Sequence, residues 1–434
     1  MKKQNTQNHN INIGIIGLGT VGQGVIQILE ENKDFIGKKI YPQQLKVKKI
    51  VDKDINKIPP SYVQYSELFT NSAEEVLNDP EIDIIVELIG GFEPAKSYII
   101  QALQSRKHVV TANKEVIARA GYEILDIAKK NKRYFLFEAS VASAIPIIGA
   151  VTRSLTSYKL KEIVAILNGT TNYILSKMSE EGKDFKEILK EAQDKGYAES
   201  DPAKDINGFD TFNKIFILST IAFRAKIDPR QIYYEGIEDI SPLDIQYGKE
   251  LGYTLKLLAL AKEDNHYLDI RVHPAFISSR HTLANINGVY NGILLCGEDF
   301  GDLTFSGLGA GSLPAGSMVV SDIIEIANNF NHYHNYYNCF QKKEIKNFLE
   351  TKSSFYLRIR VKDRPGVLAE IASSFARNQV SFASVIQKGE AGEIVDIVFL
   401  THLAREGSVQ KALREVTNLD CVENIGKVIR VVQI

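Results

Sequence analysis

A glycine-rich turn near the N-terminus constrains the fold more than any other feature of the chain. The residues Gly17-Leu18-Gly19-Thr20-Val21-Gly22 follow the apolar run INIGII and precede the helical pattern GVIQILEEN. In such a turn the first glycine permits the tight bend, the second lets the backbone approach a pyrophosphate, and the third allows close helix packing. The helix N-terminus also favours negative charge. Placed between a strand and a helix, this motif predicts a dinucleotide-binding turn.

The first third of the chain has the rhythm of a parallel α/β sheet. Apolar runs alternate with helical patterns over residues 11–145; the runs are INIGIIG, KVKKIVD, IDIIVELIG, KHVVTA and RYFLFEA. Runs without polar alternation indicate strands buried on both faces, and the intervening helices indicate parallel crossovers. We therefore predict a Rossmann-type doubly wound nucleotide-binding domain over 11–145. We expect residues 312–335, which begin with a helical pattern, to pack back on it.

Two further domains are expected after residue 145. Residues 146–311 mix helices with strands such as YKLKEIVAILNGT and LDIRVHPAFI, which predicts an α+β substrate and dimerisation domain. The polar stretch 336–353 is predicted to be a linker. Residues 354–434 then follow the order strand, helix, strand, strand, helix, strand, ending on KVIRVVQI, which is the order of a ferredoxin-like domain.

Composition narrows the function classes. A chain of 434 residues is too long for one ordinary core, and its formal net charge of -1 gives no electrostatic reason to expect nucleic acid or a membrane surface as partner. Cys296, Cys339 and Cys421 have no metal-type spacing and fit a reducing compartment. No apolar run approaches membrane-spanning length, and the polar residues 1–10 are expected to be a disordered tail. We expect a cytoplasmic protein.

The choice of dinucleotide stays open in the sequence. Asp52 ends the second predicted strand, where a carboxylate would bind the ribose hydroxyls of NAD and repel the 2′-phosphate of NADP. Lys53 follows it and would instead pair with that phosphate. The acid lies farther from the glycines than the usual spacing of about 20 residues, because IGKKIYPQQ lengthens the connection. Both residues also fit an ordinary solvated turn, so the cofactor is predicted only as NAD(P).

Two lysines are candidates for the chemistry. Lys114 follows the strand HVV at its carboxyl end, where α/β sheets place their ligands. Asp210 and Lys214 stand four residues apart on one helix face, and Glu199 and Asp205 precede them. A solvated ion pair would explain that spacing, but the helix continues as the apolar IFILSTIAF and must be partly buried. Acids around a lysine suit a substrate that carries an ammonium group and undergoes proton transfer at a carbonyl.

Blocks in a fixed order carry a family resemblance. The segments GLGTVGQGVIQIL, VVTANKEVIA, FEASVASAIPII, ILNGTTNYIL and GYAESDPAKDINGFDTFNK resemble homoserine dehydrogenases, and the resemblance covers residues 11–329. The last segment is the most specific. The resemblance implies NAD(P)-dependent interconversion of L-homoserine and L-aspartate 4-semialdehyde, in the biosynthesis of threonine, methionine and isoleucine.

The same resemblance assigns residue roles. It implies that Lys214 donates the proton to the aldehyde oxygen and that Lys114 is the second active-site lysine. The implied substrate ligands are Glu199, Asp210 and Asp205. The implied cofactor contacts are Gly17, Leu18, Gly19, Thr20, Val21, Gly22, Asp52, Lys53, Ile89, Lys114, Gly196 and Gly309.

An ion site is implied after the strand RYFLF. The resemblance implies that a sodium or potassium ion is bound there by the Glu138 carboxylate and by the backbone carbonyls of Val141, Ser143 and Ile145. The turn reads SVASAIP here, where relatives are often richer in glycine, so its backbone is more constrained.

The C-terminal domain resembles an ACT domain at its first turn. The run Asp363-Arg364-Pro365-Gly366-Val367-Leu368-Ala369 follows the strand FYLRIRV, and its backbone amides would receive an amino-acid carboxylate. The implied effector contacts are Asp363, Pro365, Gly366 and Val367, and the implied effector is L-threonine. A dimerisation module without a ligand is the alternative. Either form predicts a homodimer or a larger homo-oligomer.

Two rival functions explain less of the sequence. An ACT-tethered dehydrogenase of a hydroxy acid would account for the glycine turn and the C-terminal module, but it leaves the NGTTNY and GYAE blocks unexplained. A non-catalytic amino-acid sensor on a dehydrogenase scaffold would have no use for Lys114 and Lys214 as proton donors.

Overall fold

The structure is a computed structural model in which two compact units are described. It covers residues 10–54, 60–264, 267–298, 301–338, 340–388 and 394–433, so residues 1–9 of the predicted tail, and Cys339, lie outside the described residues. The first unit comprises Met1–Tyr158, Phe216–Ala225 and Gly307–Gln341; the second comprises Lys159–Ile215, Lys226–Ser306 and Lys342–Ile434. Within the described ranges, none of the helices combines the length and the apolar character needed to cross a membrane.

The first unit is built on a parallel sheet with the strand order β3-β2-β1-β4-β5-β6. In that order the strands are Phe69–Thr70, Gln44–Val51, Asn10–Ile16, Ile84–Glu87, His108–Thr111 and Phe135–Leu136. The strand order reverses between β1 and β4, and in such sheets ligands bind beside the carboxyl ends of the strands at this point. The predicted Rossmann-type fold is confirmed.

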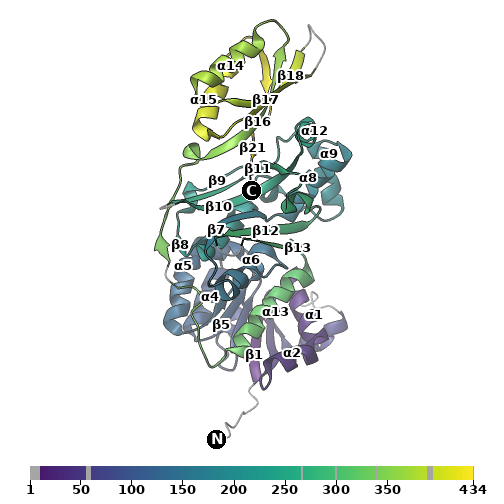
Figure 1. Ribbon diagram of the computed structural model, residues 1–434. Helices are drawn as coiled ribbons and strands as arrows, with labels where there is room; N and C mark the ends of the chain where they lie inside the picture. The colour runs from purple at the N-terminus through teal and green to yellow at the C-terminus, as the bar shows by residue number, and fades with distance from the viewer. Residues whose placement is uncertain are drawn as a thin grey trace. The chain divides into compact units, whose positions relative to one another are not determined.

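Helices cover this sheet, and one of them comes from far along the chain. Figure 1 shows α13 (Ser312–Asn328) beside α1 (Thr20–Glu31). A Cβ on Gly24 would stand 2.3 Å from the Ser312 carbonyl oxygen, and one on Gly316 would stand 2.9 Å from the Gly24 carbonyl carbon. The two glycines therefore let the helix backbones touch. The remaining helices of the unit are α2 (Lys33–Ile40), α3 (Ala73–Leu77), α4 (Ala95–Gln104), α5 (Lys114–Asn131), α6 (Ala139–Ala142) and α7 (Ile147–Gly149), with a 3-10 helix at Pro60–Leu68.

The second unit is built on a larger sheet with the order β13-β12-β7-β10-β11-β21-β16-β18-β17. The strands are Asp302–Leu308, Tyr290–Gly297, Leu160–Ile166, Tyr253–Asp264, Tyr267–Ser278, Ile429–Val431, Lys352–Lys362, Ile394–Thr401 and Phe382–Lys388. β10 and β11 form a long antiparallel pair from Tyr253↔Ser278 to Asp264↔Tyr267. The helices of this unit are α8 (Gly169–Glu181), α9 (Phe185–Asp194), α10 (Ala203–Ile206), α12 (Pro242–Glu250), α14 (Val367–Arg377) and α15 (Glu406–Thr417), and α11 (Phe209–Ala222) begins in it.

The C-terminal part has the expected ferredoxin-like order, with one difference at its end. β20 (Val422–Ile425) pairs with β16, and together with β18 and β17 it completes the four-stranded sheet. The sequence analysis missed β20, because its half-exposed residues VENI form no apolar run. The final apolar stretch instead forms β21, which pairs antiparallel with β16 and parallel with β11.

The stretch predicted as a linker contains short paired segments. β14 (Gln341–Lys342) pairs with β8 (Ala225–Lys226), and β15 (Glu344–Ile345) pairs with β11. A 3-10 helix follows at Phe348–Glu350 before β16 begins at Lys352.

Candidate functional site

The glycine turn leaves no room for side chains at its first and last glycines. Gly17 has a φ of +106°, and a Cβ there would stand 2.7 Å from the Leu88 carbonyl carbon. A Cβ on Gly22 would stand 2.3 Å from the Gly17 carbonyl oxygen. Around the Cβ position of Gly19, by contrast, no atom of the described residues lies within 4 Å. This open space beside the N-terminus of α1 fits a dinucleotide pyrophosphate.

Asp52 is tied to this turn. One of its carboxylate oxygens accepts a 2.7 Å hydrogen bond from the Leu18 backbone N–H, and the other accepts one of 3.2 Å from the Asp54 N–H. Asp52 is half-buried and Lys53 is exposed. The carboxylate therefore braces the turn from the end of β2, in addition to any contact with a ribose.

Lys114 begins a helix at the carboxyl end of β5. The Asn113 side chain caps α5 by accepting a hydrogen bond of 3.2 Å from the Val116 N–H. A cation in the first turn of a helix opposes the helix dipole, at a cost of about 0.3–1 kcal/mol. Ile89 lies in the turn after β4, where its side chain is 38 % exposed. Both predicted residues thus follow neighbouring strands of the same parallel sheet.

Lys214 and two of the predicted acids lie in one buried cluster of the second unit. The Lys214 ammonium group lies 2.7 Å from an Asp210 carboxylate oxygen and donates a 2.8 Å hydrogen bond to the Leu167 carbonyl oxygen. Both side chains are buried, so this pair is not the solvated ion pair that the spacing alone allowed.

Asn168, which was not among the residues predicted from the sequence, links the members of this cluster. Its side-chain NH₂ donates to Asp210 at 2.9 Å and to Asp205 at 2.8 Å. Its side-chain oxygen caps α8 by accepting from the Thr171 N–H at 2.8 Å. The orientation of this one amide therefore couples both acids to the start of α8. The signal was present in the NGTTNY block, where an asparagine precedes a helical pattern.

Three other predicted residues stand apart from these contacts. Glu199 and Gly196 are exposed, and the Glu199 backbone carbonyl accepts a hydrogen bond from the Gln193 side chain. Gly196 has a φ of +72°. Gly309 follows β13 and belongs to the first unit.

The predicted ion turn contains buried oxygen atoms. Glu138 is 2 % exposed; its carboxylate accepts hydrogen bonds from the N–H groups of Ile148 at 2.7 Å and Gly149 at 2.6 Å. Ser143 has a φ of +51°, and its buried hydroxyl has no hydrogen-bond partner among the described residues. Val141 and Ile145, the other predicted ligands, are also buried. A buried carboxylate and an unpartnered buried hydroxyl oxygen in the same turn are the hard oxygen groups that a sodium or potassium ion prefers.

A second carboxylate, absent from the predicted site, lies beside Glu138. Asp322 of α13 accepts a 2.8 Å hydrogen bond from the Glu138 N–H. Burial, and then the Glu138 charge, raise the pKa of Asp322 well above its usual value. Burial likewise raises the pKa of Glu138, although the N–H groups and Arg153 oppose this effect. Arg153 lies 3.5 Å from Glu138 and supplies part of the positive charge.

The predicted effector turn lies between β16 and α14. Gly366 has a φ of +97° and is the N-cap residue of α14, so the turn needs a glycine there. Asp363 accepts a 3.1 Å hydrogen bond from Gln387 of β17. Pro365 is exposed and Val367 is buried in the core beneath the turn.

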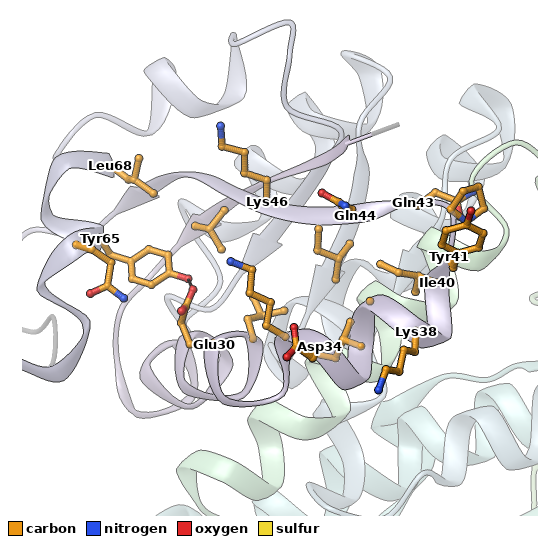
Figure 2. A pocket seen from close by; sticks show the side chains of 18 residues that line it. Glu30, Asp34, Lys38, Ile40, Tyr41, Gln43, Gln44, Lys46, Tyr65 and Leu68 are labelled. Carbon is orange, nitrogen blue, oxygen red and sulfur yellow. Dashed lines mark hydrogen bonds between the residues drawn. The ribbon is translucent and has the colours of Figure 1, made fainter. Parts of the chain in front are cut away.

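A large cavity of the first unit lies away from these residues. It has a volume of about 890 Å³ and is formed by the end of α1, by α2 and by the first residues of β2. Figure 2 shows Tyr65 directed toward Glu30, which its hydroxyl contacts at 2.5 Å, across one side of the cavity. The cavity adjoins the amino end of β2, whereas the glycine turn follows the carboxyl end of β1. None of the predicted site residues lines it.

Comparisons with known proteins cover nearly the whole chain. Family models match at 17–138 (homoserine dehydrogenase, NAD binding domain), 146–324 (homoserine dehydrogenase) and 355–421 (ACT domain). A homoserine dehydrogenase of Synechocystis sp. is 40% identical over 97% of this chain and 99% of its own. The crystal structure of one from Thiobacillus denitrificans matches with a TM-score of 0.92 and 37% identity, over 98% of this chain and 99% of that one. A hyperthermophilic archaeal homoserine dehydrogenase in complex with NADPH matches with a TM-score of 0.63 and 28% identity, over 75% of this chain and 100% of that one.

Proposed function

Because the chain belongs to the homoserine dehydrogenase family, we propose that it interconverts L-homoserine and L-aspartate 4-semialdehyde, with Lys214 as the proton donor and acceptor at the substrate oxygen. The chain is an oxidoreductase that acts on a CH–OH group, and it has an NAD(P)-binding domain. The observation that carries the proposed mechanism is the buried cluster of Lys214, Asp210 and Asn168, in which a cation is held in place by a carboxylate and a backbone carbonyl.

Reduction of the aldehyde requires a positively charged group beside the substrate oxygen. When bound, the nicotinamide dinucleotide supplies or accepts the hydride at the substrate carbon. Negative charge then develops on the aldehyde oxygen during reduction, and a lysine ammonium group stabilises it and delivers the proton. Asp210 keeps Lys214 in one orientation, and Asp205, Asp210 and Glu199 are proposed to bind the substrate ammonium group. Lys114 is proposed as the second active-site lysine.

The assay that tests this proposal is the oxidation of L-homoserine by the purified protein. Absorbance at the wavelength of the reduced nicotinamide is followed with NAD and with NADP, in buffers that contain sodium or potassium. We expect turnover with at least one of the two. A folded protein that binds dinucleotide but oxidises no L-homoserine, and reduces no L-aspartate 4-semialdehyde, would contradict the proposal.

Replacing Asp52 by asparagine is expected to shift the cofactor preference toward NADP. The amide oxygen can still accept the shorter bond from the Leu18 N–H, although the bond from the Asp54 N–H is lost, so the glycine turn keeps its support while the negative charge opposite a 2′-phosphate is removed. We expect the ratio of kcat/KM for NADP to that for NAD to rise about tenfold, which corresponds to about 1.4 kcal/mol. Asp54→Asn, a nearby exposed acid, is the control. Equal losses of kcat/KM with both cofactors would show that Asp52 supports the glycine turn but does not select the cofactor.

The Glu138 turn is proposed to hold a sodium or potassium ion. Its ligands would be the Glu138 carboxylate and the backbone carbonyls of Val141, Ser143 and Ile145, and the ion would offset the two buried carboxylates there. Glu138→Gln is expected to abolish the rise in thermal stability that sodium or potassium chloride gives over an equal concentration of tetramethylammonium chloride. Glu123→Gln, on the exposed side of α5, is the control. A wild-type protein with no such ion-specific rise would refute the ion site.

The ACT domain is proposed to bind L-threonine as a feedback inhibitor, at Asp363, Pro365, Gly366 and Val367.

We also propose a homodimer or larger homo-oligomer and a cytoplasmic location. The proposed functional domains are 11–145, 146–311 and 354–434, with 336–353 as a linker and 312–335 as part of the first domain. The family models at 17–138, 146–324 and 355–421 support the boundaries near 145 and 354, and the contact of α13 with α1 supports the assignment of 312–335 to the first domain. Calorimetric titration with L-threonine and light scattering test the effector and the assembly. No heat of binding at millimolar L-threonine, or a monomer, would reject them.

A further inference from the structure

Glu87 is a fully buried carboxylate at the carboxyl end of β4. It is the last residue of the strand IIVE, it is 0 % exposed, and it pairs in register with Thr111 at the end of β5. A buried carboxylate that only filled space would be replaced by an apolar residue at no loss, since burying a charge is costly. Its hydrogen bonds therefore indicate what it does.

Both carboxylate oxygens bind the turns that follow the two strands. One oxygen accepts a 2.9 Å hydrogen bond from the Ile89 N–H, and the other accepts a 2.7 Å bond from the Thr111 hydroxyl. The Thr111 hydroxyl in turn accepts a 2.9 Å bond from the Asn113 N–H. Glu87 is thus bonded directly to the turn after β4 and, through one hydroxyl, to the residue that caps α5.

A second bond closes the two turns on each other. The Asn113 side-chain NH₂ donates a 2.7 Å hydrogen bond to the Gly91 carbonyl oxygen, while its side-chain oxygen caps α5. Gly90 and Gly91 have φ values of +70° and +73°, so the turn needs these bonds to select one conformation among those open to glycine.

The two turns carry Ile89 and Lys114, which are proposed to contact the cofactor and the substrate. Leu88 lies directly against Gly17, since a Cβ on that glycine would come within 2.7 Å of its carbonyl carbon. Ile89 follows it, and Lys114 is the first residue of α5. Glu87 itself is buried beneath these residues, where it cannot touch a substrate.

We propose that Glu87 is a positioning residue that holds the Leu88–Gly91 turn and the start of α5 in one arrangement, so that the dinucleotide and Lys114 are correctly placed. This inference rests on the proposed function for the role of Lys114. Burial raises the pKa of Glu87 above its usual value, although the Thr111 hydroxyl, the N–H groups of Ile89 and Gly90 and the Asn113 amide oppose this effect by donating to the carboxylate.

The test compares three variants in the full-length protein. In Glu87→Gln the side chain keeps its shape but has only one acceptor oxygen. Its NH₂ group must therefore face either the Thr111 hydroxyl or the Ile89 N–H, and the hydrogen bond that this donor made to Glu87 is lost. Thr111→Val removes the same bond from the other side. Dinucleotide Kd, measured by calorimetry without turnover, is expected to weaken about tenfold in each, and kcat to fall about tenfold, with KM for L-homoserine changed less than twofold. The double variant is expected to lose no more than the larger single loss, because both changes break one bonded unit.

Two controls separate positioning from loss of fold. Glu93→Gln changes an exposed glutamate shortly after the same turn, and it should leave Kd and kcat within twofold. Ile99→Val weakens the buried face of α4 and should lower thermal stability without a change in Kd. Folded Glu87→Gln or Thr111→Val protein with wild-type Kd and kcat would overturn the proposal, as would losses that add in the double variant. A wild-type protein that binds dinucleotide without oxidising L-homoserine would refute the proposed function, while the Kd comparison would still decide the role of Glu87.

Discussion

Lys214→Ala is expected to lower kcat by about 10³-fold while dinucleotide Kd stays within about twofold. The ammonium group is buried and lies 2.7 Å from Asp210, and its removal takes away the positive charge that is proposed to stabilise the developing oxyanion. The loss should appear equally in kcat and kcat/KM, because the interaction is made in the transition state. Steady-state kinetics in both directions, with Kd from calorimetry, measure it.

A rescue experiment and a matched control sharpen this prediction. Ethylamine added to Lys214→Ala should restore part of the turnover, since a small amine fits the space left by the side chain and supplies the missing proton. Lys204→Ala, an exposed lysine of α10 close in sequence to the same cluster, should be nearly wild-type. A Lys214→Ala enzyme with kcat within threefold of wild-type would remove Lys214 from the mechanism.

Arg430→Met is expected to destabilise the second unit by about 3–5 kcal/mol. Arg430 is 3 % exposed; it donates to Glu406 at 2.7 Å and 3.1 Å, and to Glu235 at 2.6 Å. Although burial raises the pKa of Glu235, the Arg430 charge and other donors bring it below its usual value. This contribution to stability is therefore present above the ordinary glutamate pKa of about 4.3 and is lost as the pH falls below it. Methionine would leave the buried Glu406 carboxylate without its cation, whereas the half-buried Glu235 would keep its ion pair with Lys427 at 3.0 Å.

Urea denaturation followed by circular dichroism measures this loss. Arg377→Met breaks an exposed pair with Glu415 in the same unit and should cost only about 0.2–1 kcal/mol. Adding Glu406→Gln to Arg430→Met should recover much of the stability, because the buried Glu406 charge that has lost its cation is then removed. A loss below about 1 kcal/mol in Arg430→Met alone would show that the pairing contributes little.

The sequence was sufficient for features that repeat or that follow one another closely. The apolar runs predicted the parallel sheet, since strands buried on both faces leave a continuous pattern. The four-residue spacing placed Asp210 beside Lys214 because a helix enforces that proximity.

Features that depend on distant residues were not predictable in the same way. Asn168 meets Asp205 and Asp210 across roughly 40 residues of chain, so no local pattern reports the contact. The sequence pattern placed Glu87 in an apolar strand and gave it no role, because its proposed role depends on a hydroxyl group in the neighbouring strand. Helix α2 ends within the stretch IGKKIYPQQ, which was interpreted only as a longer connection, because its two buried isoleucines are too few to set a clear period.

The pairing of β21 with β11 bears on how the chain folds during synthesis. One edge of β11 pairs with three short segments, β9 (Tyr233–Tyr234), β15 and β21, and the last of these pairs with Ala275 and Phe276. Because β15 and β21 follow β11 in the sequence, a growing chain holds a long apolar strand with part of its edge open until Ile429–Val431 has been synthesised. Open edges recruit other strands. A chain in which Ile429–Val431 cannot pair would therefore be prone to aggregate through the open part of the β11 edge.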